Sequence, residues 1–379
     1  MIKIFFFFTF LLSLTYLYAQ NYTQECETLV KQGEYVKAVN RAEEGIQKEQ
    51  GNYPLYLTYV DAALYSYSSK KDTSENILIK AFQKISVLSE LSNNSFDKNK
   101  FKTLSKQLTI PVYRKAAIYI NNENYPKAKD WFEMVASLKD WSDEFDPDVY
   151  FYAGLAAYNS NDNETMVKYF DRLNKKIHKE AAVYEILGGY YFETNNLQKS
   201  KEVYLNALNN GISINFESVF NLITIYEKQK NCSEFNTYNN KMGWFSCGNM
   251  DVEKAVARVY YLCKDTAAAI EQYKNVVSQQ NNDTVALIQL GIIYYNRGIN
   301  ELKEAKSLIA KSENNIIPFR KLRDLHIEDM KSCIQNLDIA LNLNVSSPTI
   351  IQCLYNANKY LQRKEAMTKL KNKYQFIEE

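Results

Sequence analysis

The pentapeptide Tyr150–Gly154 (YFYAG) returns 34 residues later as Tyr184–Gly188 (YEILG), and a third version, Leu287–Gly291 (LIQLG), follows further along the chain. Behind the first two, a second pattern repeats at matching distances: Met166, Phe170 and Leu173, then Ser200, Tyr204 and Ala207. Residues three and four apart share one face of a helix, so each period reads as two amphipathic helices. The glycine of the first helix leaves room for the second helix to approach. This spacing predicts stacked antiparallel helical pairs.

Large-x2-Leu-Gly-x2-Tyr followed by small-x3-aromatic-x2-small resembles the tetratricopeptide repeat (TPR). Further copies start near Thr109, Phe216, Met250 and Thr284, although the copy at Thr284 needs a two-residue insertion before Ala305. Weaker units precede residue 109, and a last one runs from about Pro348 to Tyr374. The match departs from the pattern at 92–102, 139–146 and 319–343. The resemblance implies an all-α, TPR-like α-solenoid, a right-handed superhelix of antiparallel helix pairs with a concave inner surface.

The composition supports a helical protein and argues against nucleic-acid binding. Of 379 residues only 11 are glycine and 6 are proline, too few turn residues for an all-β barrel or sandwich. The formal net charge is +2, whereas proteins that wrap nucleic acid carry a clear basic excess.

The first residues read as an export signal. Lys3 precedes an apolar run from Ile4 to about Leu17, and Ala19 provides a small residue for cleavage. An uncleaved membrane anchor is the alternative, but Thr and Ser residues interrupt the run; no later segment is apolar enough to span a bilayer. The predicted organisation is a signal peptide (1–19), degenerate helical pairs (20–108), a core repeat array (109–312) and C-terminal helices with a capping unit (313–379).

The resemblance also separates packing residues from surface residues. It implies that a first set of aromatics packs between helices: Tyr119, Phe132, Phe170, Tyr191, Tyr204, Tyr226, Tyr260, Tyr273 and Tyr294. Other first-helix positions line the concave groove of the family, and here they hold Tyr113, Arg114, Phe151, Tyr152, Tyr158, Phe192, Phe220, Arg258, Tyr261, Ile288 and Tyr295. An aromatic-rich face with few charges suits an apolar or extended peptide. The alternative is that some of these rings cover adjacent repeats or interact weakly with solvent. The basic cluster with which some family members clamp a terminal carboxylate is absent.

Six cysteines in an exported chain suggest disulfides. Cys232 and Cys247 would stand about 22 Å apart along a continuous helix, too far for a bridge. Cys232 and Cys263 fall at turns of neighbouring repeats, and Cys333 and Cys353 flank a turn near Asn344, so these are the two candidate disulfides. Cys26 is expected to be an isolated packed thiol.

Catalytic motifs are missing from the sequence. His178 and His326 are the only histidines, and no CxxC, HExxH, GxSxG, P-loop or GxGxxG occurs. The acidic segment Ser142–Asp146 lacks EF-hand spacing and is expected to be a solvated linker. We therefore expect no enzyme activity, no metal site and no cofactor.

Two functions remain in view. The first is a non-catalytic protein–protein interaction scaffold in the cell envelope, periplasmic or on the outer surface, that binds a partner through the aromatic concave face. The second is a glycan-binding protein, because helical repeats also carry outer-membrane sugar-binding proteins. The abundance of Tyr, Asn, Lys and Ile, with the Ala19-Gln20 signal end, resembles proteins of Bacteroides-type bacteria. The identity of the partner and the oligomeric state are left open.

Overall fold

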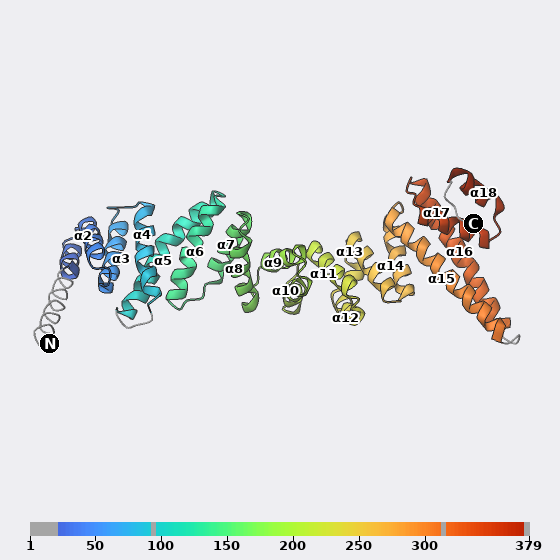
Figure 1. Cartoon of the computed structure of the whole chain (residues 1–379), viewed down its shortest axis with the longest axis horizontal. Coiled ribbons are helices and arrows are strands. Elements are labelled where there is room, and N and C mark those ends of the chain that lie inside the picture. Colours follow the sequence, from blue (N-terminus) through green and yellow to red (C-terminus); the bar gives the residue numbers. More distant parts are fainter. Residues whose placement is uncertain (1–21, 92–95, 312–315, 375–379) are drawn as a thin grey trace, which may run out of the picture. The chain divides into compact units, whose positions relative to one another are not determined.

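A computed structural model describes residues 22–91, 96–311 and 316–374, and within these ranges every regular element is a helix (Figure 1). The helices follow one another in antiparallel pairs joined by tight turns. The first helices of five successive pairs begin at Pro147, Ala181, Phe216, Met250 and Thr284, a spacing of 34 or 35 residues. The expected all-α, TPR-like solenoid is confirmed, while the handedness of its superhelix stays a prediction. The proposed signal peptide (1–19) lies outside the described residues.

The chain divides into two compact units, Met1–Leu187 and Gly188–Glu379. In unit 1 a helix over residues 22–31 precedes α2 (Tyr35–Lys48), α3 (Tyr53–Ser68), α4 (Glu75–Ser89), α5 (Lys98–Asn121), α6 (Tyr125–Trp141), α7 (Pro147–Asn159) and α8 (Asn163–Lys176). The division falls inside α9 (Ala181–Glu193). The predicted boundary after residue 108 lies within α5.

Unit 2 continues the pairs and adds one long hairpin. It contains α10 (Leu197–Asn209), α11 (Phe216–Gln229), α12 (Cys232–Met242), the short 3-10 helix η1 (Trp244–Ser246), α13 (Met250–Leu262), α14 (Thr266–Gln279), α15 (Thr284–Lys311), α16 (Ile316–Asn342), α17 (Pro348–Tyr360) and α18 (Lys364–Lys373). We call the first helix of each pair the A helix and the second the B helix.

Most turns within a pair use one local solution. A residue with left-handed φ, such as Asn161 (φ 58°), is followed by an Asn or Asp that caps the B helix. The Asp162 carboxylate accepts a hydrogen bond from the Thr165 amide at 3.1 Å, which satisfies one of the free amides at the helix start. Ile177 at the end of α8 also has a left-handed φ of 58° and is 49% exposed.

The repeated glycines are contact points between A and B helices. A Cβ on Gly154 would overlap the Phe170 ring, and one on Gly188 would lie 2.7 Å from Tyr204 Cζ, so only glycine fits there without displacement. Gly291 plays the same part, but its partner is Leu337 of α16. The expected second helix beginning before Ala305 is therefore wrong, because α15 runs on without a turn to Lys311.

Seven of the nine aromatics expected in the core are buried. Phe132, Phe170, Tyr191, Tyr204, Tyr226, Tyr273 and Tyr294 are each at most 6% exposed. Tyr119 and Tyr260 are only half-buried, since their hydroxyls reach polar partners, Glu75 for Tyr119 and Asn239 for Tyr260, each at 2.7 Å.

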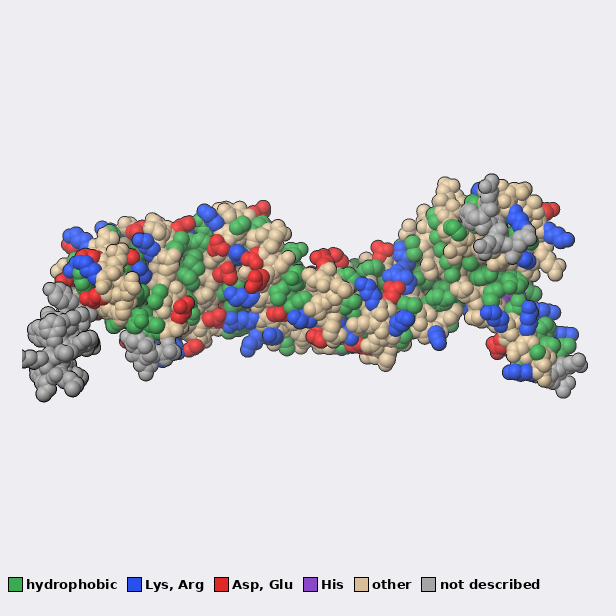
Figure 2. All heavy atoms as spheres, in the orientation of Figure 1, with side chains coloured by type: hydrophobic (Ala, Val, Ile, Leu, Met, Phe, Trp, Pro, Cys, Tyr) green, Lys and Arg blue, Asp and Glu red, His purple; other side chains and the backbone are tan. Residues whose placement is uncertain are grey.

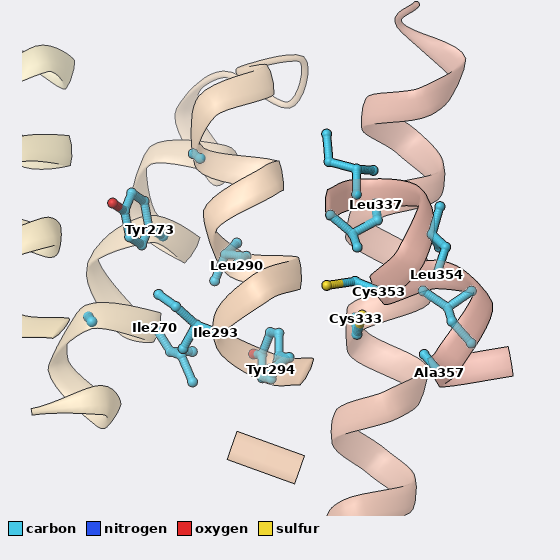
Figure 3. Packing of buried hydrophobic residues seen from close by; sticks show 14 of the residues in the cluster. Ile270, Tyr273, Leu290, Ile293, Tyr294, Cys333, Leu337, Cys353, Leu354 and Ala357 are labelled. Carbon is cyan, nitrogen blue, oxygen red and sulfur yellow. The ribbon is translucent and has the colours of Figure 1, made fainter. Parts of the chain in front are cut away.

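Side chains from five successive helices, α13 to α17, form an apolar cluster in unit 2, part of which Figure 3 shows. Tyr273 of α14, Leu290 and Ile293 of α15, Leu337 of α16 and Leu354 of α17 meet there. An A helix thus packs on its own B helix and on the preceding pair. Burial of this kind, at about 1.5–3 kcal/mol for each large apolar side chain, holds neighbouring pairs together.

The six cysteines take different roles. Cys232 at the start of α12 and Cys263 at the end of α13 form a disulfide, with their Cα atoms 5.7 Å apart. Cys333 and Cys353 lie in the apolar cluster as free, buried thiols (Figure 3), so the second expected bridge is not formed in this structure. Burial raises the pKa of Cys353 to about 11. Cys26 is a free, fully buried thiol.

Candidate functional site

The candidate site is the face of each unit that the A helices form, here called the A face. All eleven residues expected to line a groove lie on A helices, and none of them is fully buried. Arg114 and Tyr158 are exposed, while the other nine are half-buried: Tyr113, Phe151, Tyr152, Phe192, Phe220, Arg258, Tyr261, Ile288 and Tyr295. These positions therefore differ from the packing positions in having surface available for contact.

In unit 1 the predicted rings of neighbouring A helices share a B-helix ring. Phe132 of α6 stacks on Tyr152 of α7 with centroids 5.5 Å apart, and Tyr113 of α5 meets it edge-on at 5.8 Å. Burial raises the pKa of the Tyr113 hydroxyl, and Tyr152 and two nearby aspartates add to the shift. Tyr113 and Tyr152 thus pack between two neighbouring repeats and also leave part of their surface exposed on the A face.

Cation–aromatic contacts join successive A helices in unit 2. The Lys228 ammonium of α11 lies 5.4 Å from the ring centroid of Phe192 on α9. The Arg258 guanidinium of α13 lies 5.9 Å from that of Phe220 on α11. Each such contact contributes about 0.5–1 kcal/mol at an exposed site. Phe192 and Phe220, both predicted for the groove, therefore help to hold successive A helices together.

Hydrogen bonds continue this series along the A face. Asn296 of α15 donates to the Tyr261 hydroxyl of α13 at 3.0 Å, and Asn356 of α17 donates to that of Tyr295 on α15 at 3.1 Å. The alternative interpretation, that some of these rings cover adjacent repeats, describes this part of the A face well.

A pocket of about 590 Å³ opens in unit 1 between the A helices α3 and α5. The helix faces and the α3–α4 turn provide its lining: Asp61, Leu64, Tyr65, Tyr67, Ser68, Lys70, Thr73, Gln107, Ile110, Pro111 and Arg114. Tyr65 is 47% and Ile110 58% exposed, so two large apolar surfaces are open to a ligand. We call it the α3–α5 pocket.

The charged groups of the α3–α5 pocket are not paired with one another. Asp61 is half-buried and makes no ion pair or hydrogen bond with the residues that the structure describes. Burial raises the pKa of its carboxyl, an effect opposed by the more distant cation of Lys100 and reinforced by Glu27. Arg114 is exposed and likewise has no ion-pair partner among the described residues. Partial burial of a carboxylate without a partner costs free energy, and a ligand cation would offset that cost.

A second pocket, of about 420 Å³, lies on the A face of unit 2 among α11, α13 and α15. Its lining includes Arg258 and Lys254, which both form ion pairs within the protein. Lys254 Nζ lies 2.8 Å from the Asp283 carboxylate, and Arg258 Nε lies 3.4 Å from that of Glu227. The α3–α5 pocket is the stronger candidate for a binding site, because Asp61 and Arg114 have no ion-pair partner among the described residues.

Three of the residues predicted for the groove line these two pockets. Arg114 was expected on the binding face and lines the α3–α5 pocket; Phe220 and Arg258 line the second pocket. Asp61 and Tyr65 were missed because the repeat register was too weak in this region to give groove positions. A signal was present, since Asp61 is the only charged residue in the tyrosine-rich helix Tyr53–Ser68.

Within the described ranges, no three His, Cys, Asp or Glu side chains are grouped so that they could hold a metal ion. None of the described helices is both long enough and apolar enough to cross a bilayer.

Comparison with known proteins gives fold neighbours only. No family model and no curated protein matches the sequence. A TPR repeat protein of Bacteroides fragilis is 18% identical with a TM-score of 0.32, over 70% of this chain and 99% of that one. A tetratricopeptide repeat protein of Parabacteroides merdae is 13% identical with a TM-score of 0.25, over 71% of this chain and 95% of that one. The TPR domain of P58(IPK) is 12% identical with a TM-score of 0.25, over 92% of this chain and 99% of that domain.

Proposed function

We propose that the chain is a non-catalytic interaction scaffold that binds a protein partner on the A face, with the α3–α5 pocket as the main recognition site. The observation that carries this proposal is that Asp61 and Arg114, which have no ion-pair partner in the described part of the chain, lie beside the exposed side chains of Tyr65 and Ile110. A peptide segment with a basic side chain for Asp61, an acidic group for Arg114 and an apolar residue between them complements the pocket. Aromatic and arginine side chains dominate such binding sites energetically.

We further propose that the protein acts in the cell envelope, after export directed by residues 1–19. The disulfide between Cys232 and Cys263 supports this location, because structural disulfides persist mainly in oxidising compartments. The partner would then be another envelope protein.

Photocrosslinking in cells tests the surface and the partner together. A photoreactive residue in place of Tyr65, in the pocket, is expected to capture one discrete protein. The matched control replaces Val87 on the B helix α4, which is also partly exposed at 40%. Equal capture from Tyr65 and Val87 would contradict binding at the A face.

Charge variants then test the chemistry. Asp61→Asn and Arg114→Gln are each expected to lower recovery of the crosslinked partner about tenfold, a loss of ~1.4 kcal/mol. Glu164→Gln and Lys175→Gln, which change exposed charges of α8, should leave recovery unchanged. Saturable binding to polysaccharide that survives both pocket variants, with no captured protein, would favour the glycan-binding alternative.

A further inference from the structure

The helices of the α15–α16 hairpin in unit 2 are about twice as long as the neighbouring helices on which they pack. α15 has 28 residues and α16 has 27, whereas α13 and α17 have 13 each. Fourteen additional residues of helix extend a hairpin by about 20 Å at a rise of 1.5 Å per residue. Figure 1 shows both helices continuing past α14 and α17 toward a common end.

The outer part of this hairpin has no core of its own. The outermost buried side chains are Ala305 on α15 and His326 on α16. Between them, residues 306–311 and 316–325 are all exposed or half-buried. We call these two stretches the hairpin tip. Because none of the described side chains of the tip is fully buried, the stability of the repeats does not explain its length.

The hairpin tip is strongly basic. Its exposed cations are Lys306, Lys311, Arg320, Lys321 and Arg323. Across residues 306–325 the sequence sets five basic residues against two acidic ones, so this segment alone carries +3 while the whole chain carries +2. Only Arg323 has an ion-pair partner among the described residues, at 2.8 Å from the exposed Asp324.

Apolar side chains stand at the end of the same projection. Ile317 is 77% exposed, the highest value for a large apolar residue in the part of the chain that is described, and Ile316 is 47% exposed. Figure 2 shows hydrophobic and basic side chains together at this end of unit 2. The isoleucines open α16, and Arg320, Lys321 and Arg323 follow within the next two turns.

This order matches the layers of a lipid bilayer surface. Apolar side chains at the end of a projection reach the acyl boundary, while long basic side chains behind them extend to the phosphates. Anionic headgroups provide the charge complement for those cations of the tip that have no ion-pair partner among the described residues. An acidic protein surface would satisfy the cations but not the exposed isoleucines.

We propose that the hairpin tip docks the protein on a membrane surface rich in anionic phospholipids. Ile316 and Ile317 insert at the interface, and Lys311, Arg320 and Lys321 contact the headgroups. The docking is peripheral and independent of the partner site in unit 1.

Co-sedimentation of the full-length chain with vesicles tests this proposal. Binding to vesicles containing about one quarter phosphatidylglycerol should exceed binding to phosphatidylcholine vesicles at least tenfold and weaken as salt is added. Arg320→Gln/Lys321→Gln should weaken binding to the anionic vesicles about tenfold and reduce its salt dependence. Ile316→Ser/Ile317→Ser should weaken it by a similar factor without changing the salt dependence.

Matched controls isolate the hairpin tip. Lys179→Gln/Lys264→Gln removes two exposed cations elsewhere and should bind like the unaltered protein. All proteins compared retain residues 1–21, so differences between them report the substituted positions, and circular dichroism checks that each variant is helical. Equal binding by the tip variants would overturn the proposal. So would binding of soluble polyglutamate by a protein that ignores vesicles, which would make the tip a dock for an acidic protein.

Discussion

Single glycines decide how closely the helices of a pair approach, and the adjacent Gly188 and Gly189 allow a controlled test. A Cβ at Gly188 would lie 2.7 Å from Tyr204 Cζ, whereas at Gly189 the nearest such atom is the Tyr204 hydroxyl oxygen at 3.9 Å. Gly188→Ala should therefore lower the free energy of unfolding by about 1–3 kcal/mol. Gly189→Ala should raise it by up to ~1 kcal/mol through helix propensity. Urea titration of both variants measures the difference, and equal effects would disprove the close contact.

A second residue-scale prediction concerns Glu301, which lies on α15 beside Arg297 and Asp329. Burial, reinforced by the Asp329 carboxylate and opposed by Arg297, raises the pKa of Glu301 to about 7. The folded state thus holds a proton that the unfolded chain releases above pH 4.5, so stability falls as pH rises from about 4.5 to 7 and then levels off. The full effect is about 3 kcal/mol.

The substitution Glu301→Gln should remove this pH dependence. We expect the variant to unfold at higher temperature than the unaltered protein at pH 8 and at a similar temperature near pH 4. Glu164→Gln, which changes an exposed carboxyl on α8 that does not contribute to the Glu301 shift, should show no such difference. If the melting temperatures of the protein and of the Glu301 variant changed with pH in the same way, the Glu301 carboxyl would be excluded as the cause of the pH dependence.

Among the elements, the disulfide is the one covalent bond between side chains of successive pairs in the described chain. It joins the start of α12 to the end of α13 and closes a loop of 31 residues, which stabilises a domain by about 3.5 kcal/mol in the chain-entropy model. Reduction of the disulfide should lower the urea concentration at which unit 2 unfolds. Hydrogen exchange of the backbone amides of α12 and α13 measures this midpoint. A Cys232→Ser/Cys263→Ser variant should start at that lower midpoint and not respond to reductant; a shift there would place the sensitive bond elsewhere.

At the level of single helices, some positions could be predicted from the sequence and others could not. The positions of the paired helices followed from Gly154, Gly188 and their aromatic partners, because those contacts leave a periodic pattern. The course of α15 did not, because the copy starting at Thr284 keeps the family pattern as far as Gly291 and so predicts an ordinary pair. Gly298 lies further along α15. In the structure it is a contact glycine: its carbonyl lies 2.8 Å from His326 Nδ1, and a Cβ there would lie 2.6 Å from Met330 Cε.

On the scale of the whole molecule, the sequence predicted the architecture better than the candidate site. Repeats must bury their apolar faces on neighbours, so the pattern of small and aromatic residues specifies the stack. Binding leaves no comparable period. The charges that distinguish the α3–α5 pocket, Asp61 and Arg114, come from two helices, and only the fold shows that no other described residue pairs with them.

The left-handed residues at the turns also bear on how such a chain can be improved. A β-branched residue such as Ile177 is held in a conformation that L-amino acids disfavour by about 1–2 kcal/mol, and its side chain is largely open to solvent. Natural selection has therefore left a reserve of stability in the loops. Replacing such residues with glycine should give a more stable variant. Destabilising surface substitutions can then be compared in that background without unfolding the protein.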